Sequence, residues 1–250
     1  MEPYLIRGEY KVVQVLYAEP DYAALCAVDI QDREKPQVLL NVYEGGYLRR
    51  YVRLYDRIRK FPALKRVFVE KQSLVAVFPY EQGSCIDDVF QRGAAVDWEF
   101  RLAAANDLMI QTLRMLDCPP EIVCPTLLSE QVRVFPGGRR LSLRWLIRPM
   151  EGALNEREIL LLLRDQLKKI LLHRWDSPLS EREFLREMDS GRLDGMVEVY
   201  SRWKEVSPGI RAEYEKLTSM TAVGRFLRLV RVNLKDLLRQ WKEERRRGAV

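Results

Sequence analysis

The sequence predicts an α+β fold in which a β-sheet is followed by a set of helices. Before residue 82, apolar side chains recur mainly at the two-residue spacing that is typical of strands. After residue 83 they recur mainly at helical spacing, and turn-forming clusters separate segments of both kinds. We therefore expect a β-rich lobe over residues 1–82 and a helical lobe over residues 83–250.

Strands account for most of the first lobe. They are expected at "YKVVQVLY" (10–17), "YAALCAVDI" (22–30) and "QVLLNVYE" (37–44), each bounded by turn-forming residues. A further hairpin is expected in "LKRVFVEKQSLVAVFPYEQG" (64–83), with its turn at "EKQS". Short strands separated by such turns indicate an antiparallel sheet.

One helix is expected among these strands, in "YLRRYVRLYDRIRK" (47–60). Tyrosine, leucine and isoleucine recur there at helical spacing, and arginines occupy the opposite positions. Alternating arginines and tyrosines could contact nucleic acid through phosphates and stacked bases. Because the tyrosines fall on the predicted buried face, we interpret the arginines as a solvated helix face, and nucleic acid is disfavoured as a partner.

The second lobe begins with a short helix at "IDDVFQRG" (86–93) and a long one in "DWEFRLAAANDLMIQTLRML" (97–116), capped by Asp97. A second hairpin follows in "QVRVFPGGRRLSLRWLI" (131–147), with its turn at "PGG". Three or four helices complete the chain. They are expected at 155–175 with an Asn155 cap, at 180–191 with a Ser180 capping box, at 195–206, and from Thr221 onward.

This order of elements resembles the protein kinase fold. "EYKVVQVL" (9–16) is similar to the first kinase strand, and "FPYEQGSCIDDVF" (78–90) to the hinge and the helix after it. "CPTLLSEQVRVFPGGRRLSLRW" (124–145) is similar to the catalytic-loop segment and the following hairpin. The resemblance covers residues 9 to 150, and beyond them only the helix count is similar. It implies a two-lobed, protein-kinase-like fold with a β-rich N-lobe and a helical C-lobe.

The residues that a kinase uses for phosphoryl transfer are missing from the matching positions. The lysine of the kinase V-A-I-K strand is matched by Asn41, and the helix after it contains no glutamate. The resemblance places Thr126 at the catalytic aspartate and Gln131 at the metal-binding asparagine, while the metal-binding D-F-G falls near Trp145. The turn that matches the glycine loop, "YAEPDYAA", contains no glycine. The resemblance therefore implies a catalytically degenerate kinase-like domain.

Other catalytic motifs are also missing from the sequence. It contains no G-x-x-x-x-G-K-[ST] loop and no G-x-G-x-x-G. The single histidine, His173, ends a predicted helix, where it suits the helix dipole, and no Cys, His and carboxylate cluster has ligand spacing. We expect no catalytic residue, metal, cofactor or small-molecule substrate. An atypical nucleotide-binding kinase that uses displaced residues is the enzymatic alternative.

The net charge is concentrated at the end of the chain. The sequence has 42 Lys and Arg against 36 Asp and Glu, a net charge of +6. From Ala222 onward, nine residues are basic and three are acidic, so 9 − 3 gives the whole +6 and the preceding residues are neutral. In a helix, the apolar residues of this segment gather on one side, which predicts that it docks on the helical lobe through Phe226, Leu234 and Trp241.

The basic residues of the same segment are expected to contact an acidic protein partner or an anionic membrane surface. They are Arg225, Arg228, Arg239, Lys242, Arg245, Arg246 and Arg247.

Composition suggests a setting for the domain. A hydrophobic content of 47% with 31% charged residues is typical of a soluble globular protein, and no apolar run is long enough to span a membrane. Four scattered cysteines and the lack of a secretory signal favour the cytoplasm, with peripheral attachment to a membrane as the alternative.

We expect a non-catalytic pseudokinase-like domain that acts in protein–protein interaction or scaffolding. Its layout is similar to that of the cytosolic pseudokinase-like domain of bacterial type VII secretion components. A basic peripheral module that binds acidic lipid or nucleic acid is a further alternative.

Overall fold

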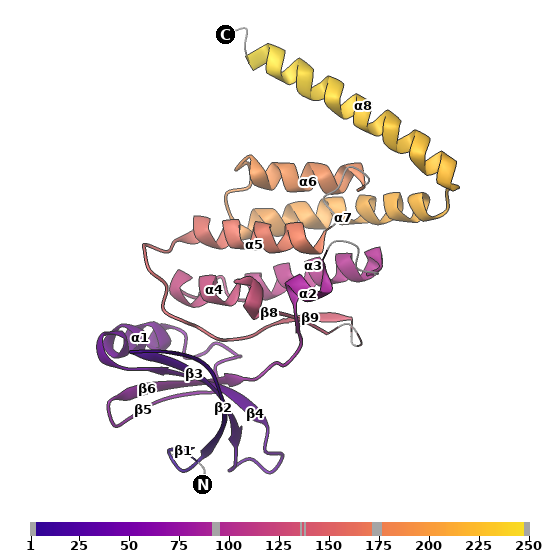
Figure 1. Ribbon diagram of the computed structural model, residues 1–250. Helices are drawn as coiled ribbons and strands as arrows, with labels where there is room; N and C mark the ends of the chain where they lie inside the picture. The colour runs from indigo at the N-terminus through magenta and orange to yellow at the C-terminus, as the bar shows by residue number, and fades with distance from the viewer. Residues whose placement is uncertain (1–3, 92–95, 136, 138, 172–176, 248–250) are drawn as a thin grey trace.

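A six-stranded antiparallel sheet forms one end of the molecule, and stacked helices form the other (Figure 1). The structure is a computed structural model that describes residues 4–91, 96–135, 137, 139–171 and 177–247. His173 and two residues of the "PGG" turn lie outside this description.

The strands of the large sheet follow the order β1-β2-β3-β4-β6-β5. They are β1 (Leu5–Ile6), β2 (Tyr10–Glu19), β3 (Tyr22–Asp29), β4 (Gln37–Tyr43), β5 (Arg66–Glu70) and β6 (Ser73–Pro79). Neighbouring strands are antiparallel, which confirms the predicted sheet. The sheet is curled, and the concave side of its outer face holds a small apolar cluster. In this cluster the rings of Tyr10 and Phe68 stack with 6.0 Å between their centroids.

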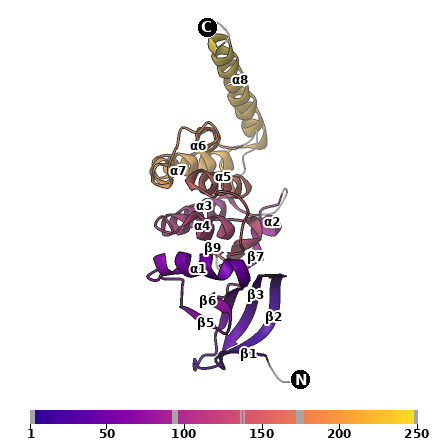
Figure 2. The same cartoon turned by 90° about the vertical axis from the view of Figure 1, so that its left-hand side faces the viewer.

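Helix α1 (Gly45–Arg57) covers the other face of the sheet. It buries Tyr51, Leu54 and Tyr55, while its arginines are exposed or half-buried, as the helical spacing predicted. In both views α1 lies on the side of the sheet that faces the helical lobe (Figures 1 and 2). An ion pair of 3.7 Å between Arg50 and Glu121 of α4 (Pro120–Thr126) links the two lobes there.

The helical lobe begins after the chain leaves the sheet at residues 80–83. Its elements are β7 (Ser84–Cys85), α2 (Ile86–Val89), α3 (Trp98–Leu113), α4, a 3₁₀ turn (Ser129–Gln131), β8 (Val132–Phe135), β9 (Arg140–Leu143), α5 (Glu156–Ile170), α6 (Leu179–Asp189), α7 (Met196–Thr218) and α8 (Ala222–Arg247). Two predicted caps are confirmed, since Asp97 accepts from the Phe100 amide at 2.7 Å and Asn155 from the Glu158 amide at 3.2 Å.

Two predictions about these helices were wrong. Ser180 does not cap α6, because the helix already begins at Leu179 and its N-terminal amides donate to the carboxylate of Glu213 in α7. Helix α7 was expected to end near residue 206 but continues through Pro208. A proline removes one backbone donor, and burial of residues further along the same helix face compensates for that loss.

Helix α8 leaves the end of α7 and projects beyond the lobe (Figures 1 and 2). The prediction that it docks through its apolar side was wrong, because Phe226 is 60% exposed and Leu234 is 55% exposed. Two polar contacts join its described side chains to the lobe: Arg182 donates to Asn233 at 2.8 Å, and Arg228 pairs with Glu213 at 3.5 Å.

The side chain of Trp241 lies outside the described ones. The same holds for the predicted contact residues Arg225, Arg239, Lys242, Arg245, Arg246 and Arg247. Among the described residues, no helix, α8 included, combines the length with the apolarity needed to cross a membrane.

Candidate functional site

Asn41 lies in the middle of β4 and is fully buried between the two lobes. Its amide nitrogen donates to the carbonyl oxygen of Trp145 at 2.8 Å. Its carboxamide oxygen accepts from the backbone amide of Ile147 at 2.8 Å and from the hydroxyl of Tyr22 at 2.8 Å. The residue matched to the kinase lysine therefore fastens the sheet to the segment that follows β9.

Tyr43 strengthens the same connection two residues further along β4. Its hydroxyl donates to the carbonyl oxygen of Ile147 at 2.7 Å and lies 2.8 Å from the hydroxyl of Tyr55 in α1. Its ring stacks on Tyr51 with 4.0 Å between the centroids. Burial raises the pKa of both Tyr43 and Tyr55 well above the ordinary value, so these phenols stay neutral and act as hydrogen-bonding groups.

Trp145, which the resemblance places at the metal-binding D-F-G, fills space between the lobes. It is 8% exposed, stacks on Phe78 of β6 at 5.7 Å and meets the edge of Phe61 at 5.1 Å. An indole has no anionic oxygen with which to bind Mg²⁺. Trp145 instead joins the lobes through its carbonyl oxygen, which accepts from Asn41, and through its ring, which packs on Phe78.

Thr126 and Gln131 are buried within the helical lobe, in α4 and the 3₁₀ turn after it. Thr126 ends α4, is fully buried, and donates its hydroxyl to the carbonyl oxygen of Val123 at 2.8 Å. Gln131 is 3% exposed, and its side-chain oxygen has no hydrogen-bond partner within the part of the chain that the structure describes. Neither side chain carries the carboxylate that a protein kinase uses as its catalytic base.

The turn between β2 and β3, which matches the kinase glycine loop, is fastened to the start of α1. The amide of Glu44 donates to the carbonyl oxygen of Asp21 at 2.9 Å. The Asp21 carboxylate lies so close to Gly45 that a Cβ added there would come within 2.7 Å of it. Acidic side chains in this turn, Glu19 and Asp21, would repel a phosphate, whereas a glycine loop offers backbone amides to it.

Arg144 lies beside the junction of the two lobes and was not identified from the sequence. It precedes Trp145, and its guanidinium carbon lies 5.4 Å from the centroid of the Tyr80 ring. Tyr80 belongs to the segment that joins the lobes. Burial lowers the pKa of the Arg144 guanidinium. Within the part of the chain that the structure covers, its Nε has no hydrogen-bond partner. The match to the kinase lysine pointed to Asn41, but no local pattern pointed to an arginine here.

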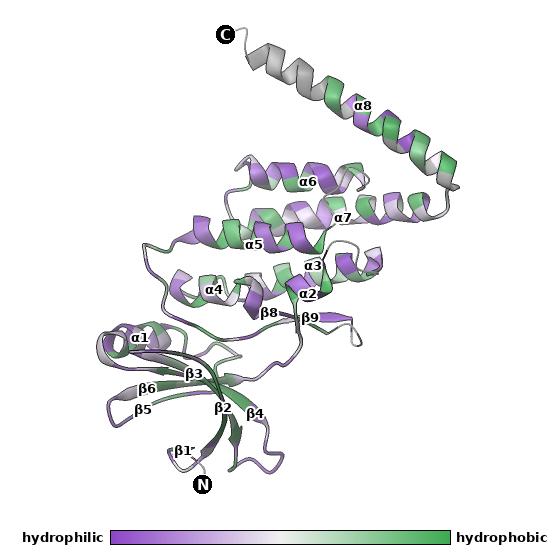
Figure 3. Ribbon diagram, viewed as in Figure 1, coloured by the Kyte–Doolittle hydropathy of each residue, from purple (hydrophilic) through white to green (hydrophobic). Residues whose placement is uncertain are grey.

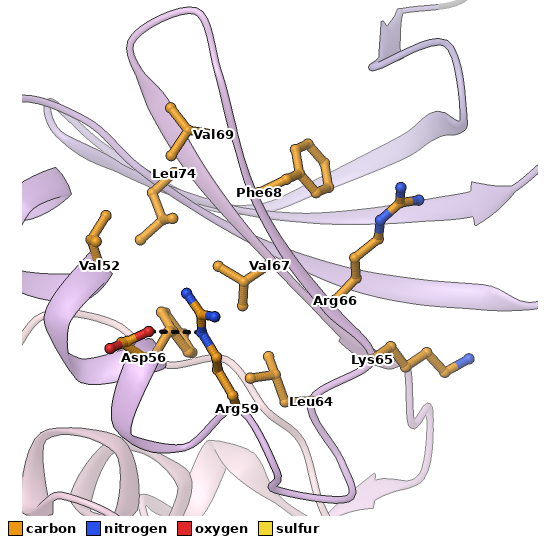
Figure 4. Close-up of a pocket in the computed structure, with 11 residues that line it drawn as sticks. Val52, Asp56, Arg59, Leu64, Lys65, Arg66, Val67, Phe68, Val69 and Leu74 are labelled. Atoms are coloured by element: carbon orange, nitrogen blue, oxygen red, sulfur yellow. Dashed lines mark ion pairs between the residues drawn. The ribbon is translucent and has the colours of Figure 1, made fainter.

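Hollows in the described part of the chain lie away from Asn41. One groove of about 460 Å³ runs between α1 and β5, and Figure 4 shows Leu64 and Val67 beside the Asp56–Arg59 ion pair at its edge. A second of about 830 Å³ lies behind Trp145, between residues 61–63 and α3. Among the described residues, no group of three or more His, Cys, Asp and Glu is arranged to hold a metal ion.

Comparisons with known proteins bear on the fold. No protein-family model and no curated protein sequence matches the chain. The apo structure of a pseudokinase is similar to this chain with a TM-score of 0.54 and 13% identity, over 79% of this chain and 92% of that one. At this identity the likeness shows the fold alone. Together with the curled sheet and the helical lobe, it shows that the chain has a two-lobed, protein-kinase-like fold.

Proposed function

We propose that this chain is a non-catalytic, pseudokinase-like module that acts through protein–protein interaction or scaffolding. The observation that carries the proposal is the burial of Asn41, whose side chain makes three hydrogen bonds between the lobes. In a kinase the corresponding lysine holds the ATP phosphates. Here the matched side chain is neutral and its bonding groups are occupied by the protein itself.

The other matched positions support the same proposal. Phosphoryl transfer depends on cations and donors that stabilise the charge on the moving phosphoryl group. The indole of Trp145 has no oxygen with which to hold a hard cation, Thr126 lacks the carboxylate of the matched aspartate, and the turn at Asp21 is acidic. The loss of one group would leave residual activity, whereas the loss of all of them removes the basis for catalysis.

A binding role is the natural use of a kinase-like fold without this chemistry. The similar solved structure is itself called a pseudokinase, which supports the proposal at the level of fold. One apolar core runs from the sheet through the helical lobe, and a smaller cluster lies on the outer face of the sheet, so the fold presents stable surfaces.

The test of catalysis is a phosphoryl-transfer assay with γ-labelled ATP and either Mg²⁺ or Mn²⁺. We expect no label on the chain or on a general protein substrate. The control variant is Arg144→Ala, which removes the guanidinium that lies over Tyr80 and leaves the hydrogen-bond partners of Asn41 unchanged. Labelling that follows the wild-type chain through purification, and that is missing from a mock preparation made without the chain, would contradict the proposal.

The test of a binding role is affinity recovery of the folded chain from its native host. We expect a partner to be recovered in stoichiometric amount, and the same partner to bind the Arg144→Ala variant. A chain that elutes alone under mild conditions would count against scaffolding.

A further inference from the structure

Helix α8 presents an unpartnered apolar side to solvent. It is 26 residues long, about 39 Å at the usual rise per residue. Seven of its large apolar side chains are between 39% and 69% exposed. This apolar stripe consists of Val223, Phe226, Leu227, Val230, Leu234, Leu237 and Leu238. Figure 3 shows the corresponding mixture of apolar and polar residues along the helix.

The stripe is broad and continuous. At about 100° per residue, its members fall within about a third of the helix circumference. A two-stranded coiled coil needs a narrower seam of alternating three- and four-residue steps. Phe226 and Leu238 lie on either side of that seam and widen it, which suits a flat apolar surface better than a single partner helix.

The contacts of α8 with the lobe keep the stripe exposed. Arg228 pairs with Glu213 of α7, and Asn233 accepts a hydrogen bond from Arg182 of α6. Both residues of α8 lie outside the stripe, so the helix is held by its polar side. Its apolar side therefore faces away from the lobe at the end of the molecule opposite the sheet (Figure 1).

Charge indicates what covers the stripe. The segment from Ala222 onward holds nine basic and three acidic residues, and it carries the entire net charge of the chain. Arg231 and Lys235 are exposed and flank the stripe on one side. Pairing with a second copy through the stripe would bring two such basic segments together, whereas an anionic surface would attract them.

We propose that α8 lies in the interface of an anionic lipid bilayer. The stripe enters the boundary between headgroups and acyl chains, and the flanking arginines and lysines contact lipid phosphates. No segment needs to cross the membrane. This inference goes beyond the non-catalytic role and does not depend on it, because the vesicle assay below and the phosphoryl-transfer assay have independent outcomes.

The test is co-sedimentation of the full chain with two kinds of vesicle, phosphatidylcholine alone and phosphatidylcholine mixed with phosphatidylglycerol. We expect binding to the mixed vesicles that weakens as salt rises, and little binding to phosphatidylcholine alone. The double variant Leu227→Asp, Leu234→Asp should bind the vesicles at least about tenfold more weakly at every salt concentration. The reason is that each leucine side chain stabilises the bound state by burying apolar surface in the bilayer. Both side chains are exposed, so the fold and its unfolding midpoint should not change.

Charge is tested with two matched triple variants. Reversal of Arg245, Arg246 and Arg247 to Glu should weaken binding to the anionic vesicles roughly tenfold or more and flatten its salt dependence. Reversal of Arg49, Arg53 and Arg57 on the exposed side of α1 makes the same change in net charge and should have a much smaller effect.

Three results would overturn the inference. The first is a wild-type chain that does not bind the anionic vesicles. The second is equal binding by the wild type and the leucine variant. The third is a dimer, measured by sedimentation equilibrium, that is lost in the leucine variant while vesicles remain unbound; this would assign the stripe to a second copy of the chain.

Discussion

The side-chain amide of Asn41 donates a 2.8 Å hydrogen bond to the carbonyl oxygen of Trp145, 104 positions further along the chain. Asn41 lies in a central strand of the β-rich lobe, and Trp145 lies in the helical lobe, in the segment that follows β9. Because both groups are buried, the bond is made without competition from water. The same pair of positions is matched to the lysine and the metal-binding motif of a kinase. A connection between the lobes thus joins the two positions that the resemblance assigns to the lysine and the metal-binding motif.

Replacing Asn41 by leucine should destabilise the fold severely. The leucine fills a similar volume but leaves the Tyr22 hydroxyl, the Ile147 amide and the Trp145 carbonyl buried without a partner. We expect a loss of about 3 kcal/mol or more in the free energy of unfolding, measured by urea denaturation. A loss below about 1 kcal/mol would mean that these bonds do not hold the lobes together.

Restoring the kinase residue with Asn41→Lys should also destabilise the fold, because the ammonium group would be buried without an anion. The variant should gain no phosphoryl-transfer activity. Both outcomes can be read from urea denaturation and the labelled-ATP assay on one preparation. A stable Asn41→Lys protein that transfers phosphate would contradict the degenerate assignment.

Gly45→Ala should be destabilising, by roughly 1–3 kcal/mol. Gly45 has a positive φ of 47°, which alanine tolerates poorly, and the added methyl group would collide with the Asp21 carboxylate. Gly46 is the matched control, since it lies in α1 and a Cβ there meets nothing within 4 Å. Gly46→Ala should be neutral or slightly stabilising in thermal unfolding. Equal effects at both positions would show that the contact at Asp21 is unimportant.

Asp97 should give a measurable pH dependence. Its hydrogen bond from Arg139, followed by that from the Phe100 amide, lowers the pKa of this carboxyl below its ordinary value of 3.8. A carboxyl with a lowered folded-state pKa stabilises the fold above its unfolded pKa, and this contribution is lost as pH falls through the folded-state value. Because the side chain is 52% exposed, the contribution should be below about 1 kcal/mol.

The comparison that measures it is wild type against Asp97→Asn, since asparagine caps a helix as well but carries no charge. The wild type should be the more stable at neutral pH, and the two proteins should converge in acid. A difference in unfolding free energy that is the same at neutral pH and in strong acid would assign the effect to the cap rather than to the charge.

Two buried cysteines provide a probe of the helical lobe. Burial raises the pKa of Cys124 to about 12 and that of Cys118 to about 11, so little thiolate forms at pH 8. Iodoacetamide should leave both unmodified in the folded protein and label both in urea, as peptide mass spectrometry would show. Rapid labelling of Cys124 without denaturant would mean that α4 opens readily.

Local sequence patterns predicted much of the fold. The strands, the buried tyrosines of α1 and the caps at Asp97 and Asn155 were all identified, because each depends on residues within a turn or a strand of one another. The order of these elements was enough to indicate the two-lobed arrangement.

The missed features depend on residues distant in the chain. The cap of α6 comes from Glu213, and a sequence pattern that looks only three residues ahead favoured Ser180 instead. The exposed stripe of α8 has the same periodicity as a core-facing helix, so spacing alone could not separate docking from exposure. Asn41 was singled out only by its match to the kinase lysine, and its bonds to Trp145 and Ile147 required the folded chain.

The central claim is that side chains of the protein close the cleft in which a kinase holds its nucleotide. The most direct test is thermal unfolding of the wild type with and without about 5 mM ATP, in the presence and absence of Mg²⁺. A ligand at a hundredfold excess over its dissociation constant would add about 2.7 kcal/mol to the free energy of unfolding. That contribution would raise the unfolding midpoint by several degrees in a chain of this size. We predict no shift under either condition. A saturable rise in the midpoint with ATP that disappears in Arg144→Glu would contradict the claim.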